Sequence, residues 1–502
     1  MNWSLLVSSY GNVILDPQII LMIFLGAIGG VLIGSIPGLT STMGIALLIP
    51  FTYGMDLLPS IGLLLGIFCG GMYGGSIAAI LIRTPGTPAA AATVMDGYPM
   101  GQKGEAGRAL SIALFSSFVG GMIGAIIMTF LSPLVSRMAL KFGPGEFFTL
   151  AVFGLSVIIS ISGKSITKGL ISAFFGLILA TIGMDKTCAY LRFSKSVSLY
   201  EGMPFIPTLI GLFAISEVLS GIEKILDSEK IVAKITSILP SKDDIKRIMP
   251  SIVRGGLIGT FIGAIPGAGG DIAAFVSYSE SKRVSKHPEL FGTGVPEGIA
   301  AAESSNNGCS GGAMIPLLSL GVPGDSNTAV MLGAFIMKGI QPGPMMYVDN
   351  LEIVYSVFAA MICANIAMML VGMGGIRVFS KVISLDKQKL LPMILVLSFV
   401  GAYSMNGNMF DVGLALVMGV IGYLMQKYDY PLSPILLALI LGPMSESNLR
   451  RMMQINDGNF LKLFTRPICV VLLLLALASL ISSVINQKKI EKKLKNKIEQ
   501  DV

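Results

Sequence analysis

Long apolar runs separated by short charged loops dominate the chain, and they predict membrane-spanning helices. A helix needs about 20 predominantly apolar residues to cross a bilayer. Full-length or shorter segments of this kind lie at Ser60–Ile82, Ala109–Leu134, Phe147–Ile161, Ile166–Met184, Phe205–Ile222, Val354–Ile376, Leu391–Tyr403, Val412–Met425, Pro431–Leu441 and Pro467–Ile485. Gly and Pro interrupt three further apolar stretches, Ile19–Leu58, Ile252–Ser281 and Pro296–Lys338. Non-helical backbone at membrane depth survives only against protein or a water-filled cavity, so these stretches predict where the functional site lies.

The composition supports an integral membrane protein. Hydrophobic residues make up 53% of the 502 residues and charged residues only 13%, against roughly a quarter charged in an ordinary soluble domain. The five cysteines are scattered and form no CxxC pair. These values exclude a typical cytosolic enzyme, a secreted disulfide scaffold, a coiled coil and a disordered chain. We therefore predict an all-α fold, a polytopic transmembrane helical bundle.

Charged residues set the expected orientation and division of the chain. The net charge is +7, and the lysine-rich C-terminal tail is expected in the cytoplasm because positive charge favours that side. The longest hydrophilic stretch, Glu223–Arg254, is expected on the same side. We predict a first transmembrane repeat at residues 1–222, a cytoplasmic amphipathic linker at 223–250, a second transmembrane repeat at 251–486 and a Lys-rich cytoplasmic tail at 487–502.

Four short motifs recur in the same order in the two halves, as expected of an internal repeat. The pairs are Gly34-Ser35-Ile36-Pro37-Gly38 with Gly263-Ala264-Ile265-Pro266-Gly267, Gly74-Gly75-Ser76-Ile77 with Gly311-Gly312-Ala313-Met314, Thr84-Pro85-Gly86 with Val322-Pro323-Gly324, and Asp96-Gly97-Tyr98-Pro99-Met100-Gly101 with Lys338-Gly339-Ile340-Gln341-Pro342-Gly343. The loop Phe51–Ser60 has no Lys or Arg, whereas the matching loop of the second half carries Lys282, Arg283 and Lys286. The two repeats are therefore predicted to have inverted topology, with the N-terminus outside.

Inverted repeats with broken helices are typical of secondary transporters, whose substrate site lies near the membrane midplane. Half-helix N-termini there present free N–H groups, which suit a carboxylate. The residues predicted to bind substrate are Ser35, Pro37, Gly38, Thr40, Ser41, Pro85, Gly86, Thr87, Pro266, Gly267, Gly269, Asn306, Asn307, Pro323, Gly324 and Ser326. The candidates for ion coupling are Asp271, Glu303, Asp325 and Thr328, with a Na⁺ site expected near the same loops.

Each of these polar residues also has a structural interpretation. A Ser, Thr or Asp after a helix break can act as an N-cap and have no binding role. The run Glu303-Ser304-Ser305-Asn306-Asn307 can form hydrogen bonds between helices and have no binding role. A carboxylate and two amides inside an apolar segment are nevertheless costly unless they pair or bind something. We therefore favour a site-lining role for the cluster as a whole.

No enzyme or nucleotide site is expected. Gly163-Lys164-Ser165 ends like a P-loop, but Ile158 stands where the upstream Gly is required. The only histidine, His287, lies in a charged loop, which disfavours a Ser–His intramembrane protease. We expect no cofactor, no ATP and no nucleic-acid partner.

In combination, Gly34–Leu39, Gly70–Arg108 and Gly263–Pro344 resemble the large membrane subunit of the tripartite tricarboxylate transporter family. The resemblance implies a bacterial inner-membrane protein of about twelve spans. It also implies a small membrane subunit of about four spans, a periplasmic substrate-binding protein, and uptake of organic acids driven by an ion gradient, often of Na⁺. The resemblance also implies that substrate is bound by Ser35-Ile36-Pro37-Gly38, Pro85-Gly86, Pro266-Gly267, Asn306-Asn307 and Pro323-Gly324.

Two acids depart from the family pattern. Asp325 follows Pro323-Gly324 and Asp271 follows Pro266-Gly267, where they disfavour a second negative charge and suit a cation instead. The resulting hypothesis is import of a di- or tricarboxylate coupled to Na⁺ or H⁺ by alternating access. A passive organic-anion channel is the main alternative, and a scaffold subunit without transport is a third.

Overall fold

The computed structural model describes residues 2–161, 165–185, 189–194, 196–223, 239–382 and 387–500. Helices make up nearly all of its regular structure. They are α1 (Trp3–Leu15), α2 (Pro17–Ser35), α3 (Ser41–Leu48), α4 (Leu57–Ile82), α5 (Ala90–Met100), α6 (Ala106–Ala139), α7 (Pro144–Ile161), α8 (Ile166–Ala180), α9 (Phe205–Leu209), α10 (Ser216–Glu223), α11 (Lys242–Gly263), α12 (Gly269–Val284), α13 (Pro296–Leu320), α14 (Ser326–Met337), α15 (Met346–Asp349), α16 (Leu351–Val382), α17 (Lys387–Asn406), α18 (Met409–Lys427), α19 (Ser433–Ile455) and α20 (Pro467–Gln500). The described strands are β1 (Gly183–Met184) and β2 (Leu191–Arg192), which pair antiparallel.

Seven helical segments of the described chain are long and apolar enough to cross a membrane, and several shorter apolar helices accompany them. The chain is therefore a multi-pass helical membrane protein, as its hydrophobic pattern predicts. The seven segments are Pro17–Ser35, Leu57–Ile82, Ala90–Ala139, Phe205–Glu223, Leu351–Gly375, Met409–Lys427 and Pro467–Ile485. The larger number of spans implied by the family resemblance stays a prediction.

Local structure differs from the sequence prediction at four places. The segment predicted to end at Met184 ends at Ala180, because the chain turns there into the short β-hairpin. A π-helical stretch, Ile210–Ile215, interrupts the span that begins at Phe205. The N-terminal helix α1 was not predicted. The last residues of the predicted linker form the start of α11, because Ser241 and Asp244 build a capping box; residues 224–238 of that linker lie outside the described part.

The predicted helix breaks occur at the motif prolines and glycines. In the first half the order is α2, an Ile-Pro-Gly loop, α3, α4, a Pro-Gly loop and α5. In the second half the same order runs through α11, α12, α13 and α14. The elements of the repeated motif therefore follow each other identically in the two halves.

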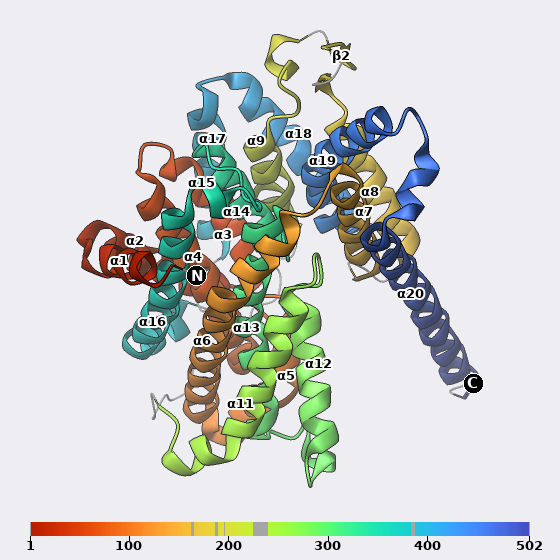
Figure 1. Cartoon of the computed structure of the whole chain (residues 1–502). Coiled ribbons are helices and arrows are strands. Elements are labelled where there is room, and N and C mark those ends of the chain that lie inside the picture. The colour runs from red at the N-terminus through yellow and green to blue at the C-terminus, as the bar shows by residue number, and fades with distance from the viewer. Residues whose placement is uncertain are drawn as a thin grey trace.

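Small residues allow the long helices of this core to approach closely. A Cβ atom at Gly26 would lie 2.1 Å from the carbonyl oxygen of Leu63, and one at Gly30 would lie 2.5 Å from that of Ile67. This is the small-xxx-small packing expected of membrane helices. Helix α13 lies near the centre of the molecule (Figure 1), and its residues from Gly298 to Ser319 are buried.

Ionic contacts join α6 and α11 at one end of this core. The Arg108 guanidinium donates hydrogen bonds to the Asp244 carboxylate, with its Nη2 atom 2.5 Å from Oδ1. This guanidinium holds the pKa of Asp244 below its usual value, because it favours the charged carboxylate. The contact therefore fixes the start of α11, where the chain re-enters the helical core.

Two neighbouring glycines of α2 test the packing against α4. Gly30→Ala is expected to lower the apparent Tm in detergent, because overpacking a tight contact costs about 1–3 kcal/mol. Gly29→Ala is the matched control, since no atom lies within 4 Å of a Cβ at Gly29. Equal Tm values for the two variants would contradict the close α2–α4 contact.

Candidate functional site

A cavity of about 600 Å³ lies where the broken helices of the two halves meet. The N-terminal ends of α3, α12 and α14 reach it, together with residues from the π-helical stretch and from the α18–α19 connection. Helix N-termini carry partial positive charge and N–H groups that lack intrahelical partners. The cavity therefore has the geometry expected of a site for a small polar or anionic ligand.

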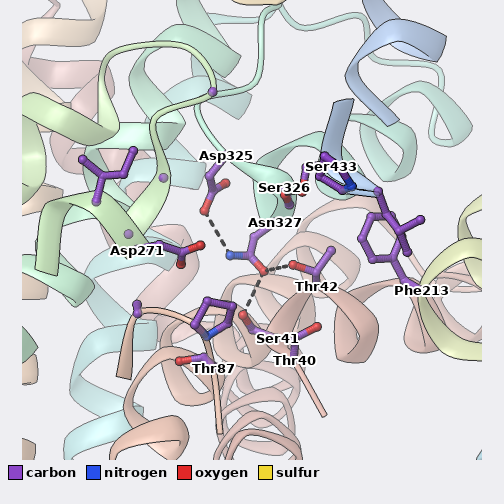
Figure 2. Close-up of a pocket in the computed structure, with 18 of the residues that line it drawn as sticks. Thr40, Ser41, Thr42, Thr87, Phe213, Asp271, Asp325, Ser326, Asn327 and Ser433 are labelled. Carbon is purple, nitrogen blue, oxygen red and sulfur yellow. Dashed lines mark hydrogen bonds between the residues drawn. The ribbon is translucent and has the colours of Figure 1, made fainter. Parts of the chain in front are cut away.

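Asn327 connects the two halves of the chain inside the cavity. Its Oδ1 accepts hydrogen bonds from the hydroxyls of Ser41 and Thr42, both at 2.8 Å. Its Nδ2 donates to Oδ2 of Asp325 at 3.0 Å. Figure 2 shows this chain of contacts running from α3 to the N-terminus of α14. The two broken helices are thus held together by one amide.

Asp325 both lines the cavity and caps α14. Its Oδ1 accepts a hydrogen bond from the Thr328 N–H at 2.8 Å, and the Thr328 hydroxyl is 2.6 Å from the same oxygen. Asp325 is only 5% exposed. Thr328 is fully buried and takes part in this capping box, so it reaches the cavity only through Asp325.

Asp271 lies in the first turn of α12 and is exposed to the same cavity. Figure 2 shows Asp271 and Asp325 directed toward one space beside Asn327. Two carboxylates that interact electrostatically raise each other's energy unless a proton or a cation lies between them. Glu217 and Asp429 also line the cavity, whereas its described lining includes no Lys, Arg or His.

Further oxygen atoms without a hydrogen-bond partner among the described residues lie in the cavity wall or directly behind it. In the described part of the chain, Thr87 Oγ1 and Asn306 Oδ1 are buried and have no hydrogen-bond partner. Thr87 lines the cavity, and Asn306 lies directly behind its wall, because a Cβ at Gly270 would be 2.8 Å from Asn306 Oδ1. Carboxylate, hydroxyl and amide oxygens are the ligand types that hard cations prefer.

The predicted site residues divide into three groups. Those that line the main cavity are Thr40, Ser41, Thr87, Gly267, Gly269, Asp271, Asp325 and Ser326. Those that line a neighbouring cavity of about 290 Å³ are Pro37, Gly38 and Pro85. Those that line neither cavity are Ser35, Gly86, Pro266, Glu303, Asn306, Asn307, Pro323, Gly324 and Thr328.

Gly86 and Gly324 act through close packing at the two Pro-Gly tips. A Cβ at Gly86 would lie 2.0 Å from the carbonyl oxygen of Gly34, and one at Gly324 would lie 2.5 Å from that of Gly263. In the second half, the Gly267 N–H also donates to the Gly324 carbonyl at 2.9 Å. The motif glycines therefore bring each Pro-Gly tip against the helix that precedes the Ile-Pro-Gly break.

Glu303 lies apart from the cavity, between three helices. It is fully buried on α13 and accepts hydrogen bonds from the hydroxyls of Thr93 on α5 and Ser117 on α6, the latter at 3.0 Å. Asn307 is also fully buried, and neither of its amide atoms has a hydrogen-bond partner among the described residues. The polar run of α13 thus faces the helices around it more than the cavity.

Several lining residues were missing from the predicted site. Asn327 follows a predicted N-cap within a recognised motif, so its amide was a usable signal. Phe213, Gln426 and Ser433 come from segments with no motif, and only the tertiary fold brings them to the cavity. Ser433 nevertheless contacts a predicted residue, because its hydroxyl is 2.9 Å from that of Ser326.

The comparison with known families bears directly on this cavity. Residues 20–437 match the sequence profile described as the tripartite tricarboxylate transporter TctA family. The chain belongs to the TctA family. This family is one of transporters and not of enzymes, and its members are the large subunits of tripartite systems. The matched region contains every residue that lines the main cavity.

Two curated relatives from Agrobacterium vitis agree with membership of the TctA family. One, an uncharacterized 52.8 kDa protein in the TAR-I ttuC' 3'region, is 37% identical over 468 residues, which cover 93% of each chain. The other, an uncharacterized protein in the TAR-II ttuC' 3'region, is 37% identical over 223 residues, which cover 44% of this chain and 92% of the relative. No solved structure matches the chain.

The bridge made by Asn327 gives a prediction about stability. Asn327→Ala is expected to lower the free energy of unfolding by about 1–3 kcal/mol, because the buried hydroxyls of Ser41 and Thr42 and the Oδ2 atom of Asp325 lose their shared hydrogen-bond partner. Thermal unfolding in detergent measures the change, with Asn350→Ala, outside the cavity, as the control. An unchanged Tm for Asn327→Ala would contradict the bridging role.

Proposed function

We propose that this TctA-family chain is the large transmembrane subunit of a binding-protein-dependent secondary transporter that imports a di- or tricarboxylate with a cation. The observation that carries the proposal is the cavity in which helix N-termini from both halves meet Asp271 and Asp325. Binding sites of this kind, at broken helices between repeats, are typical of secondary transporters.

The carboxylates of the cavity argue for a coupled cation. An organic acid in this space meets Asp271 and Asp325, and like charges at close range repel strongly in a low-dielectric site. A cation bound between these two acids weakens the repulsion, because it cancels one of the two negative charges next to the substrate. The nearby oxygens of Thr87 and Asn306 favour Na⁺ over H⁺ as that cation, because a bound Na⁺ requires several oxygen ligands.

Helix N-termini supply the part of the proposed binding site that would hold the substrate carboxylate. The N-terminus of α3, which begins with Ser41, and that of α12, which begins with Gly269, both reach the cavity. Thr40 caps α3 through Met43 N, whereas no side chain caps α12. N–H groups without an intrahelical partner are suitable donors to a substrate carboxylate.

We propose a location in the bacterial inner membrane, with the C-terminus in the cytoplasm and the N-terminus outside. A periplasmic binding protein would deliver the substrate, and a small membrane subunit of about four spans would complete the complex. Family membership and the lysine-rich tail support this arrangement.

Uptake into proteoliposomes tests the proposal. Labelled citrate, succinate or glutamate is expected to accumulate above equilibrium only with an inward Na⁺ gradient and with the two partner subunits present. Flux that merely equilibrates, whatever the ion or the binding protein, would instead support a passive organic-anion channel.

Charge-neutral variants of the two cavity acids test the cation site. Asp271→Asn and Asp325→Asn are each expected to raise the Na⁺ concentration for half-maximal uptake at least about tenfold, the effect of losing about 1.4 kcal/mol. Asn remains a good N-cap, so Asp325→Asn should keep α14 folded. Asp243→Asn, at the exposed start of α11, is the control. An unchanged Na⁺ dependence in both cavity variants would exclude these acids as the cation site.

Glu303 is proposed to hold α5, α6 and α13 together. Gln can keep both hydroxyl contacts, because its Oε1 accepts from one hydroxyl and its Nε2 donates to the other. Glu303→Gln should therefore retain Na⁺-coupled uptake, while Glu303→Ala should lower the amount of folded protein in the membrane. Loss of coupling in a well-folded Glu303→Gln variant would show that Glu303 itself carries the coupling ion.

A further inference from the structure

Two charged residues at corresponding places of the repeated motif each bind a loop of the opposite half. They are Asp96, near the end of α5, and Lys338, which directly follows α14. In the sequence, Asp96-Gly97 and Lys338-Gly339 stand at the same point after the two Pro-Gly motifs. Neither residue lines the main cavity, so their contacts need a separate explanation.

The Asp96 carboxylate accepts hydrogen bonds from backbone N–H groups of the loop between α12 and α13. Its Oδ1 accepts from Gly292 at 2.9 Å, Gly294 at 2.8 Å and Val295 at 2.9 Å. Its Oδ2 accepts from the Tyr278 hydroxyl at 2.8 Å, and the carboxylate is fully buried. One carboxylate therefore holds both the loop and the last part of α12.

The Lys338 ammonium donates hydrogen bonds to backbone carbonyls of the loop between α3 and α4. Its Nζ donates to the Thr52 carbonyl at 2.5 Å, to the Tyr53 carbonyl at 3.1 Å and to the Met55 carbonyl. Asp56 of the same loop adds a favourable electrostatic interaction. The contact is the chemical counterpart of the first, with an ammonium on carbonyls in place of a carboxylate on N–H groups.

The two contacts connect equivalent elements, but the half that supplies the helix in one contact supplies the loop in the other. Asp96 joins α5 of the first half to the α12–α13 loop of the second, and Lys338 joins α14 of the second half to the α3–α4 loop of the first. In Figure 1, α12 runs to the bottom of the view, whereas α14 and α15 lie in its upper half.

Each contact holds one helix whose other end lines the cavity. Helix α12 begins with cavity residues that include Asp271 and ends next to the loop that Asp96 binds. Helix α3 begins with the cavity residues Ser41 and Thr42 and ends next to the loop that Lys338 binds. Release of either contact therefore removes one anchor near the outer end of one cavity-lining helix.

We propose that Asp96 and Lys338 are positioning residues of two latches that close opposite sides of the cavity and open alternately during transport. The proposal rests on the proposed transport function. The loop held by Asp96 follows Lys282, Arg283 and Lys286, so this latch closes the cytoplasmic side. The Lys338 latch closes the outer side. The described structure has both latches formed.

Thiol accessibility from each side of the membrane tests the latches without using a substrate. The reporter is Ser433→Cys, which places a thiol in the cavity wall, in a chain whose native cysteines are replaced by Ala. A membrane-impermeant maleimide is added to spheroplasts or to inside-out vesicles. Asp96→Asn is expected to speed labelling from the cytoplasmic side about tenfold, and Lys338→Gln from the outer side, because charge-assisted hydrogen bonds are lost.

Matched variants separate a latch from a general loss of structure. Lys282→Gln and Asp243→Asn change exposed charges of the same kinds and should leave both rates unchanged. Lys338→Arg should restore slow labelling, because Arg can still donate to several carbonyls. A monodisperse peak in size-exclusion chromatography establishes that each variant is folded.

The outcomes decide the two proposals separately. Faster labelling from opposite sides in the two variants supports the latches, even if no carboxylate is taken up. The latches are overturned if labelling is faster from the same side in both variants, or if the labelling rate of the folded variants is unchanged. Neither result bears on Na⁺-coupled uptake, which has its own test. General unfolding of Asp96→Asn and Lys338→Gln would also overturn the proposal, because the residues would then be structural only.

Discussion

The structure depends on one constraint, that every backbone N–H and C=O at membrane depth needs a partner. The Ile-Pro-Gly breaks interrupt helices inside the apolar core and leave such groups without intrahelical bonds. Capping side chains, the Gly267–Gly324 backbone hydrogen bond and buried polar residues supply part of the compensation. The N-terminus of α12, which no side chain caps, reaches the cavity, where a ligand can bind it. The same breaks that are costly to the fold therefore create the binding site.

The polar residues around this region have separable roles. Asn327 and the Asp325 capping box hold the broken helices to each other, and Asp271 opens onto the cavity. Glu303 joins three helices at a distance from it. Asp96 and Lys338 fix the outer ends of α12 and α3. A cavity with helix ends anchored at both sides can change its access without a change in its chemistry, which is what a coupled transporter requires.

The sequence predicted the parts of this arrangement that depend on local chemistry. Pro-Gly and Ile-Pro-Gly motifs identify helix breaks because Pro removes a donor and Gly permits close approach, and the breaks lie where they were expected. The positions of Phe213, Gln426 and Ser433 in the cavity wall could not be predicted, because they follow from how distant helices pack. The hairpin after α8 was missed because Ile182-Gly183-Met184 continues an apolar pattern that does not distinguish helix from strand.

The cavity is proposed to bind an organic acid together with a cation. The most direct measurement is equilibrium binding of labelled citrate, succinate and glutamate to the purified complex, in Na⁺ and in choline at equal ionic strength. Because coupling between two ligands is reciprocal, we predict that Na⁺ tightens binding of the preferred acid and that this acid tightens binding of Na⁺. Equal affinity in Na⁺ and in choline would contradict it.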